Sequence, residues 1–256
     1  MTMTRAIRTS FWVGVAALFL GTWGVAQTSV TLTGPPPGYV YDGIYVSPYY
    51  ATVGGATNTP VVCDDFGDVS TLSTWNATIT PFSSISSTNT SWSLAGKTLT
   101  QYYAVAWLTL QVLHQTPGTT GQIIYSFADW ALFDPSGVAN YLTKNPITSG
   151  VLTTAYLCNQ IFGTGSYSGG VCTAGTGGLL ASAYGAGVPA GIGNMEIISP
   201  DSGTGICKAE TGCVAQEFIA FVPEGGAAMG YIALASLCCF GAMFLRSRRQ
   251  MPVPTV

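Results

Sequence analysis

The acidic side chains of one short stretch are the first residues with chemical potential. Residues 64–68 are Asp-Asp-Phe-Gly-Asp, so three carboxylates (Asp64, Asp65 and Asp68) fall within five positions. Carboxylate oxygens are the ligands that Ca²⁺ prefers, which makes these acids a weak metal candidate. The spacing does not fit an EF-hand loop, because no glutamate follows at the required distance. The pattern therefore favours a solvated turn that holds no metal.

Paired carboxylates would also permit acid–base hydrolysis. Such a hydrolase needs two acids facing each other across a cleft, one with a raised pKa. The acids available for the two sides are Asp64 or Asp65 and Asp129 or Asp134. His114 is the only histidine and no Gly-x-Ser-x-Gly motif is present, which argues against a Ser-His-Asp triad. We predict a non-enzymatic protein without a cofactor, with the hydrolase as the alternative.

The cysteines suggest disulfides if the chain is exported, because oxidation is favoured outside the cytoplasm. Of the seven cysteines, five precede residue 227. Two pairs are close in sequence, and we predict that they form disulfides: Cys158 with Cys172, and Cys207 with Cys213. Other pairings of five thiols remain open. Cys63 is then left over, and a buried free thiol is the interpretation we favour.

An internal thioester is the alternative for Cys63. Residues 125–130 are Tyr-Ser-Phe-Ala-Asp-Trp. This stretch is similar to the Thr-Gln-x-Ala-Ile-Trp-like motif of thioester domains in bacterial adhesins. The resemblance implies a bond from an early cysteine to the glutamine of the motif. Ser126 occupies that glutamine position and cannot form the bond, and Gln122 lies one helical turn earlier.

Composition and charge limit the class of protein. Only 7% of the 256 residues are charged, against about 25% in typical soluble domains, which favours export or membrane attachment. Between residues 27 and 222 the chain has three lysines, ten acids and no arginine, a balance of 3 − 10 = −7. Phosphate backbones would be repelled by such a surface, so no nucleic-acid partner is expected.

The first 26 residues have the pattern of a signal peptide. Arg5 and Arg8 give a positive start, and residues 11–25 are almost continuously apolar. Gly24 and Ala26 supply the small side chains that signal peptidase requires. We therefore predict cleavage after Ala26 and export of the chain that follows.

The opposite end of the chain has the pattern of a membrane span. Residues 227–245 are nineteen residues without a charge, enough for a helix that crosses a hydrocarbon core of about 30 Å. Arg246, Arg248 and Arg249 follow at once. Basic residues next to a span stay in the cytoplasm, so they predict a stop-transfer signal, contact with membrane lipid and an external domain.

A short motif precedes the predicted span. It consists of Val222, Pro223, Glu224, Gly225 and Gly226. Motif, span and basic end together resemble the sorting tail (residues 222–250) of PEP-CTERM proteins, although Gly225 replaces the usual second proline. The resemblance implies processing by an exosortase-type membrane protease or transpeptidase. It also implies delivery to the cell surface or to an extracellular matrix rich in exopolysaccharide. A plain single-span protein that is never processed is the alternative.

The segment between the two ends, residues 27–221, is long enough for one domain. Short aromatic and β-branched runs predict strands in its first part, and helical spacing predicts helices over residues 99–114, 120–133 and 147–162. Strands are expected again at residues 195–198 and 216–221. We predict an α+β fold: a single exported domain with a β-rich N-terminal part, two to three central helices and C-terminal strands, followed by one transmembrane helix.

Several tyrosines in the β-rich part are candidate contacts for sugar rings. They are Tyr39, Tyr41, Tyr45, Tyr49 and Tyr50. Sheet packing explains alternating tyrosines equally well. The function that we predict is adhesion to polysaccharide or to partner proteins at the cell surface.

Overall fold

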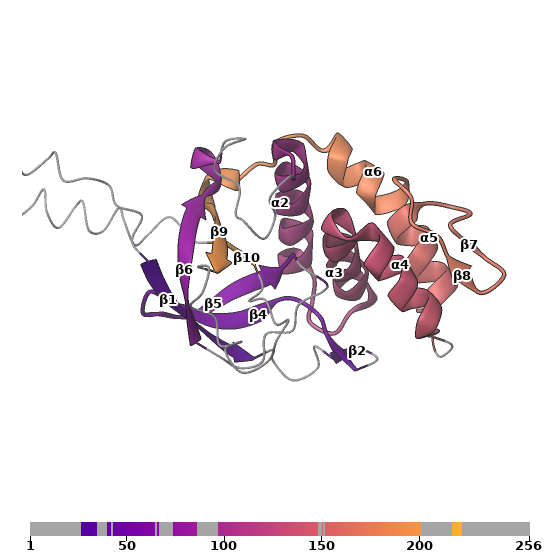
Figure 1. Ribbon diagram of the computed structural model, residues 1–256, viewed down its shortest axis with the longest axis horizontal. Helices are drawn as coiled ribbons and strands as arrows, with labels where there is room; N and C mark the ends of the chain where they lie inside the picture. Colours follow the sequence, from indigo (N-terminus) through magenta and orange to yellow (C-terminus); the bar gives the residue numbers. More distant parts are fainter. Residues whose placement is uncertain are drawn as a thin grey trace, which may run out of the picture.

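A β-barrel and a group of helices packed side by side form the described part of the chain (Figure 1). The computed structural model describes residues 27–34, 40–41, 43–64, 66, 74–85, 97–147, 150, 152–200 and 217–221. The barrel strands come from both ends of this region, and the helices come from its middle.

Six strands close into the barrel in the order β1-β4-β5-β10-β9-β6, with β6 paired back to β1. All six pairings are antiparallel. The strands are β1 (Gln27–Gly34), β4 (Tyr49–Val53), β5 (Ala56–Cys63), β6 (Thr74–Pro81), β9 (Met195–Pro200) and β10 (Phe218–Phe221). A closed barrel has no unpaired edge strand, so it presents no template for pairing with another chain.

Alternation along the strands explains why the interior of the barrel is filled. In β6, Trp75 and Ala77 are buried while Thr74 and Asn76 are exposed. The Trp75 ring stacks on Phe218 of β10 with 5.8 Å between ring centroids. Such pairs contribute about 0.5–1.5 kcal/mol beyond the area that they bury. Aromatic rings from different strands therefore fix how the barrel closes.

The helices begin at side chains that cap them. They are α2 (Leu99–His114), α3 (Thr120–Phe133), α4 (Pro135–Lys144), α5 (Thr154–Phe162) and α6 (Gly178–Gly185). Thr98 forms a capping box with Gln101 at the start of α2, and Thr119 caps α3. Side-chain oxygens at these positions accept from backbone N–H groups that have no partner within the helix. The predictions for residues 99–114 and 120–133 are confirmed.

The third predicted helix differs from the structure. Residues 147–162 were expected to be continuous, but α5 starts only at Thr154, with Thr153 as its N-cap. A further helix, α4, starts directly after α3, because the Asp134 carboxylate accepts from the Gly137 N–H at 2.8 Å. Pro135 ends α3, yet it is favourable in the first turn of α4. The same residues thus end one helix and begin another.

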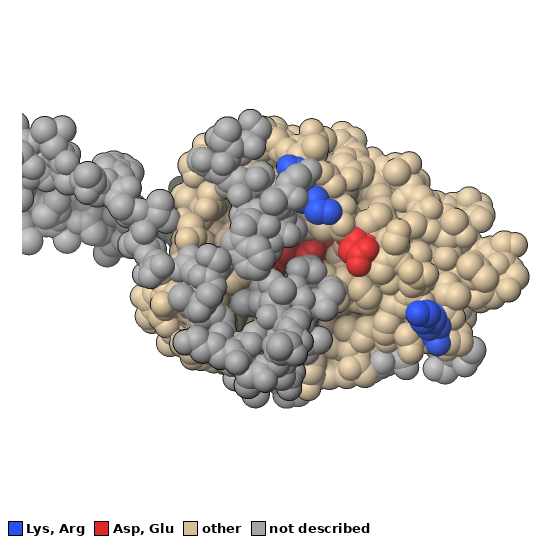
Figure 2. Space-filling view, viewed as in Figure 1, with Lys and Arg blue, Asp and Glu red and all other residues tan. Residues whose placement is uncertain are grey.

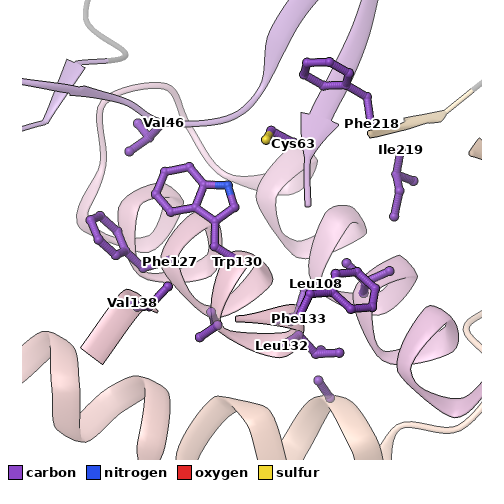
Figure 3. Close-up of a cluster of buried hydrophobic side chains, with 14 of the residues drawn as sticks. Val46, Cys63, Leu108, Phe127, Trp130, Leu132, Phe133, Val138, Phe218 and Ile219 are labelled. Atoms are coloured by element: carbon purple, nitrogen blue, oxygen red, sulfur yellow. The ribbon is translucent and has the colours of Figure 1, made fainter. Parts of the chain in front are cut away.

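Aromatic side chains join the helices to the barrel strands. Phe66 follows β5 and lies among Phe127 and Trp130 of α3 and Tyr141 of α4, with centroid distances of 5.4–6.4 Å. Figure 3 shows Phe127 and Trp130 lying near Val46 and Cys63. The stretch that contains Asp64 is therefore part of the core.

Two small sheets lie outside the barrel. One pairs β2 (Val40–Tyr41) with β3 (Ile44–Tyr45), and the other pairs β7 (Tyr167–Ser168) with β8 (Val171–Cys172). Short 3₁₀ turns at Phe82–Ser84 and Ile192–Asn194 complete the described elements. The β2–β3 hairpin lies between the barrel strands and the helices at one side of the molecule (Figure 1).

The predicted fold class is wrong. It expected a β-rich N-terminal part, two to three central helices and C-terminal strands. Instead, β9 and β10 lie between β5 and β6 and close one six-stranded barrel with the N-terminal strands, and the described residues form five α-helices. Alternation in a strand identifies its buried face but does not specify its neighbours. The predicted transmembrane helix is likewise unsupported: residues 227–245 lie outside the described residues, and no helix within the described part is long and apolar enough to cross a membrane.

Candidate functional site

A buried polar stripe runs along α3 where this helix meets the barrel. Its members are Gln122, Ser126 and Asp129, which are spaced i, i+4 and i+7 and so share one helical face. All three side chains are at most 1% exposed. Buried polar groups need partners, so the contacts of this stripe decide whether it is structural or chemical.

Ser47 is the residue on which the stripe converges. Its carbonyl oxygen accepts from Gln122 Nε2 at 2.6 Å and from Ser126 Oγ at 3.4 Å. The other end of the Gln122 carboxamide accepts from the Gly118 N–H at 2.5 Å. On the barrel side, Ser47 Oγ accepts from the Cys63 N–H at 3.1 Å. Ser47 therefore ties the end of β5 to α3.

Cys63 is a buried thiol that forms no disulfide with another described residue, as predicted. The structure gathers around Ser47 the three residues that the thioester alternative concerns: Cys63, Gln122 and Ser126. Ser126 brings a hydroxyl to the position where a thioester needs a carboxamide. Gln122 uses both ends of its carboxamide in hydrogen bonds to the backbone. The arrangement fits a structural link between β5 and α3.

Two acids are buried next to the ends of neighbouring strands, Asp64 directly after β5 and Glu217 directly before β10. Phe218 of β10 pairs with Cys63 of β5, so the register sets Glu217 opposite Asp64. Both acids are fully buried, and Ser199 Oγ donates to Glu217 Oε2 at 2.5 Å. Burial raises the pKa of the Tyr102 phenol, and the charges of Glu217 and Asp64 raise it further. The phenol of α2 thus lies within electrostatic range of both carboxyl groups.

The prediction of a solvated turn at residues 64–68 is wrong for Asp64, because this side chain is fully buried. Asp65 and Asp68 lie outside the described residues. Among the residues that the structure does describe, no three His, Cys, Asp or Glu side chains gather closely enough to hold a metal ion.

The acids considered for the hydrolase alternative differ in their burial and in their contacts. Asp129 is fully buried, and neither of its carboxyl oxygens has a hydrogen-bond partner within the described residues. Burial raises its pKa well above the ordinary value. Asp134 is half-buried and caps α4. A catalytic pair needs one acid that reaches substrate, and Asp64 and Asp129 are both closed off from solvent.

The disulfide between Cys158 and Cys172 is confirmed. It joins α5 to β8 across a sequence separation of 14 residues. Thr143 Oγ of α4 accepts from the Cys172 N–H at 3.0 Å, which attaches the bridged loop to a third element. Closing a loop of this length stabilises a fold by about 3 kcal/mol in the chain-entropy model. The predicted partners Cys207 and Cys213 lie outside the described residues.

The terminal signals also lie outside the described residues. This applies to the predicted signal peptide (residues 1–26), to the motif at residues 222–226 and to Arg246, Arg248 and Arg249. His114 occupies the last turn of α2, where a basic side chain is favourable.

Sequence reasoning missed Ser47, Tyr102 and Ser199, because isolated polar residues carry no motif. Glu217 offered one signal: it directly precedes the apolar run 218–221, so a strand at that position carries the acid into the core.

Comparison with known proteins adds no relative. No family model, no curated protein and no solved structure matches the chain.

Proposed function

We propose that this chain is an exported, non-catalytic protein of the bacterial surface or extracellular matrix that associates with polysaccharide. The Cys158–Cys172 disulfide carries the proposal. Structural disulfides persist in oxidising compartments and are rare in the cytoplasm. The signal-peptide pattern of residues 1–26 supports the same location, with signal peptidase as the processing partner.

A non-catalytic role fits the buried polar residues. Gln122 and Ser126 bind the backbone of Ser47, and Asp134 caps α4. Asp64 and Asp129 are both fully buried. These residues act within the fold, which supports adhesion over hydrolysis.

The export proposal is tested by comparing the full chain with a variant that lacks residues 2–26. Both are expressed in a bacterium with an oxidising periplasm, and free thiols are alkylated before lysis. In the full chain, the disulfide should protect Cys158 and Cys172 from alkylation. In the truncated chain, both cysteines should be reduced and therefore alkylated. Equal labelling of these cysteines in the two chains would contradict export.

We further propose that residues 222–226 are a sorting signal for an exosortase-type enzyme. The support is the resemblance of the motif, in which Pro223 and the two glycines favour an accessible backbone. Replacing Pro223 and Glu224 by alanine should block maturation in the native host, whereas Pro252→Ala should not. Maturation is monitored by immunoblotting, and normal maturation of the double variant would refute the proposal.

A further inference from the structure

The β2–β3 hairpin presents one side-chain pair to the core and the other to solvent. Tyr41 and Ile44 are cross-strand partners, and both pack against the core. Val40 and Tyr45 form the other pair. Their exposed fractions are 52% and 53%. Side chains opposite each other in antiparallel strands are about 5 Å apart, so these two form one continuous apolar patch.

Hydrogen bonds hold this hairpin in place on both sides. The Tyr41 hydroxyl donates to the Leu152 carbonyl at 3.0 Å, which ties the hairpin to the segment before α5. The Tyr49 hydroxyl of β4 donates to the Tyr45 carbonyl at 2.7 Å, which ties it to the barrel. The exposed pair is therefore presented at a fixed position, and binding to it costs little conformational entropy.

The pairing separates this patch from the other exposed apolar side chains of the described residues. Those are Tyr156 on α5, Val171 on β8, Tyr184 on α6 and Val188 after it. No cross-strand pairing joins any two of them. Isolated exposed apolar residues are normal on protein surfaces, whereas an anchored aromatic–aliphatic pair is a candidate contact surface.

The charge of the chain argues against a polyanionic partner. Seven described residues are Lys, Asp or Glu, and three of these are fully buried. The remaining four are two lysines and two acids: Lys97, Lys144, Asp134 and Glu196. Few of the described residues on the face drawn in Figure 2 are charged. Residues 27–222 as a whole carry three lysines and ten acids, so a polyanion would be repelled.

The size of the patch argues against a protein partner. Stable protein interfaces bury about 800 Å² on each side, far more than one valine and one tyrosine supply. A polysaccharide chain needs only one ring of its repeat to lie on a tyrosine face, with the phenol hydroxyl available for a hydrogen bond. Weak contacts of this kind add up when many copies of a protein share one polymer.

We propose that Tyr45 and Val40 form a contact site for neutral polysaccharide, with the Tyr45 ring as the stacking surface. This inference rests on the proposed association with polysaccharide and names the residues that would provide it. The Tyr45 ring faces a sugar ring, and Val40 borders it with apolar surface.

The test is affinity electrophoresis of the mature protein in gels that contain dextran, hydroxyethylcellulose, galactomannan or the anionic polymer alginate. We expect retardation by at least one neutral polymer, unchanged by added salt, and none by alginate. Tyr45→Ala should weaken the affinity about fivefold or more, as expected when one aromatic contact is lost. Tyr45→Phe should retain most of the binding.

Tyr184→Ala is the matched control, because Tyr184 is 36% exposed and lies on α6, which Figure 1 shows far from β2. Thermal unfolding of each variant shows that its fold is intact. Retardation that survives Tyr45→Ala overturns the site but leaves polysaccharide association standing. Absence of retardation in every neutral gel overturns both. Analytical ultracentrifugation tests whether the patch instead binds a second copy of the chain. A dimer that is lost in the Tyr45→Ala variant would also overturn the site.

Discussion

Replacing Asp129 by asparagine should stabilise the protein at neutral pH and leave it nearly unchanged in acid. The Asp129 carboxyl is fully buried on α3 without a hydrogen-bond partner in the described residues, and burial raises its pKa. In the unfolded chain the pKa of an aspartate is about 3.9. The folded protein therefore holds this proton at pH values where the unfolded chain has released it.

The sign of the pH dependence follows from that difference. A carboxyl whose pKa is higher in the folded than in the unfolded state makes its full contribution to stability only below about pH 4. As the pH rises above this value, the unfolded chain releases the Asp129 proton while the folded protein retains it. The free energy of unfolding therefore falls by up to about 1.4 kcal/mol per pH unit. The loss continues until the folded carboxyl ionises. Asparagine has the same shape and no titration, so Asp129→Asn removes this contribution.

The assay is urea unfolding of the mature protein and the variant at a series of pH values from 4 to 8. The difference between the two free energies of unfolding should grow with pH, with the variant the more stable. Asp134→Asn is the control, because asparagine also caps helices well and the cap at α4 is retained. A difference between Asp129→Asn and the parent that stays constant with pH would refute the reasoning.

Two further substitutions test the packing between the elements. Gln122→Ala should cost about 2 kcal/mol in urea unfolding, because it removes two hydrogen bonds worth about 1 kcal/mol each, one to the buried Ser47 carbonyl and one from the Gly118 N–H. Gln160→Ala on the exposed face of α5 should change stability by less than about 0.5 kcal/mol, and equal losses would contradict the role of Gln122. Gly178→Ala should cost about 2 kcal/mol or more in thermal melts, because Gly178 has a φ of +56° and an added Cβ overlaps the backbone of α5. Gly185→Ala meets nothing within 4 Å, so a comparable loss there would contradict the close α5–α6 approach.

The helices were predictable because their signals are local. Apolar spacing predicted the helices over residues 99–114 and 120–133, and the structure shows that Thr98 and Thr119 cap them. The start of α4 was missed because Asp134 and Pro135 serve as a helix stop and a helix start at once. A short sequence separation was also sufficient to pair Cys158 with Cys172.

The barrel was not predictable, because its closure depends on contacts distant in sequence. Phe218 pairs with Cys63 of β5, 155 positions earlier by their residue numbers (218 − 63 = 155). The burial of Asp64 depends on the same pairing and on Phe66 packing among helix aromatics. Acidic composition alone predicts solvent exposure, and tertiary contacts reverse it here. The convergence of Cys63, Gln122 and Ser126 on Ser47 likewise needs all these elements in place.

Mass spectrometry of the intact protein, purified from whole cells of its native host together with their surface layer, tests the account most directly. The proposed export predicts a chain that begins at Gln27 and contains the Cys158–Cys172 disulfide without prior oxidation. The proposed sorting predicts a new C-terminus within residues 222–226. A chain that retains residues 1–26 and has both cysteines reduced would contradict export, which is the central claim.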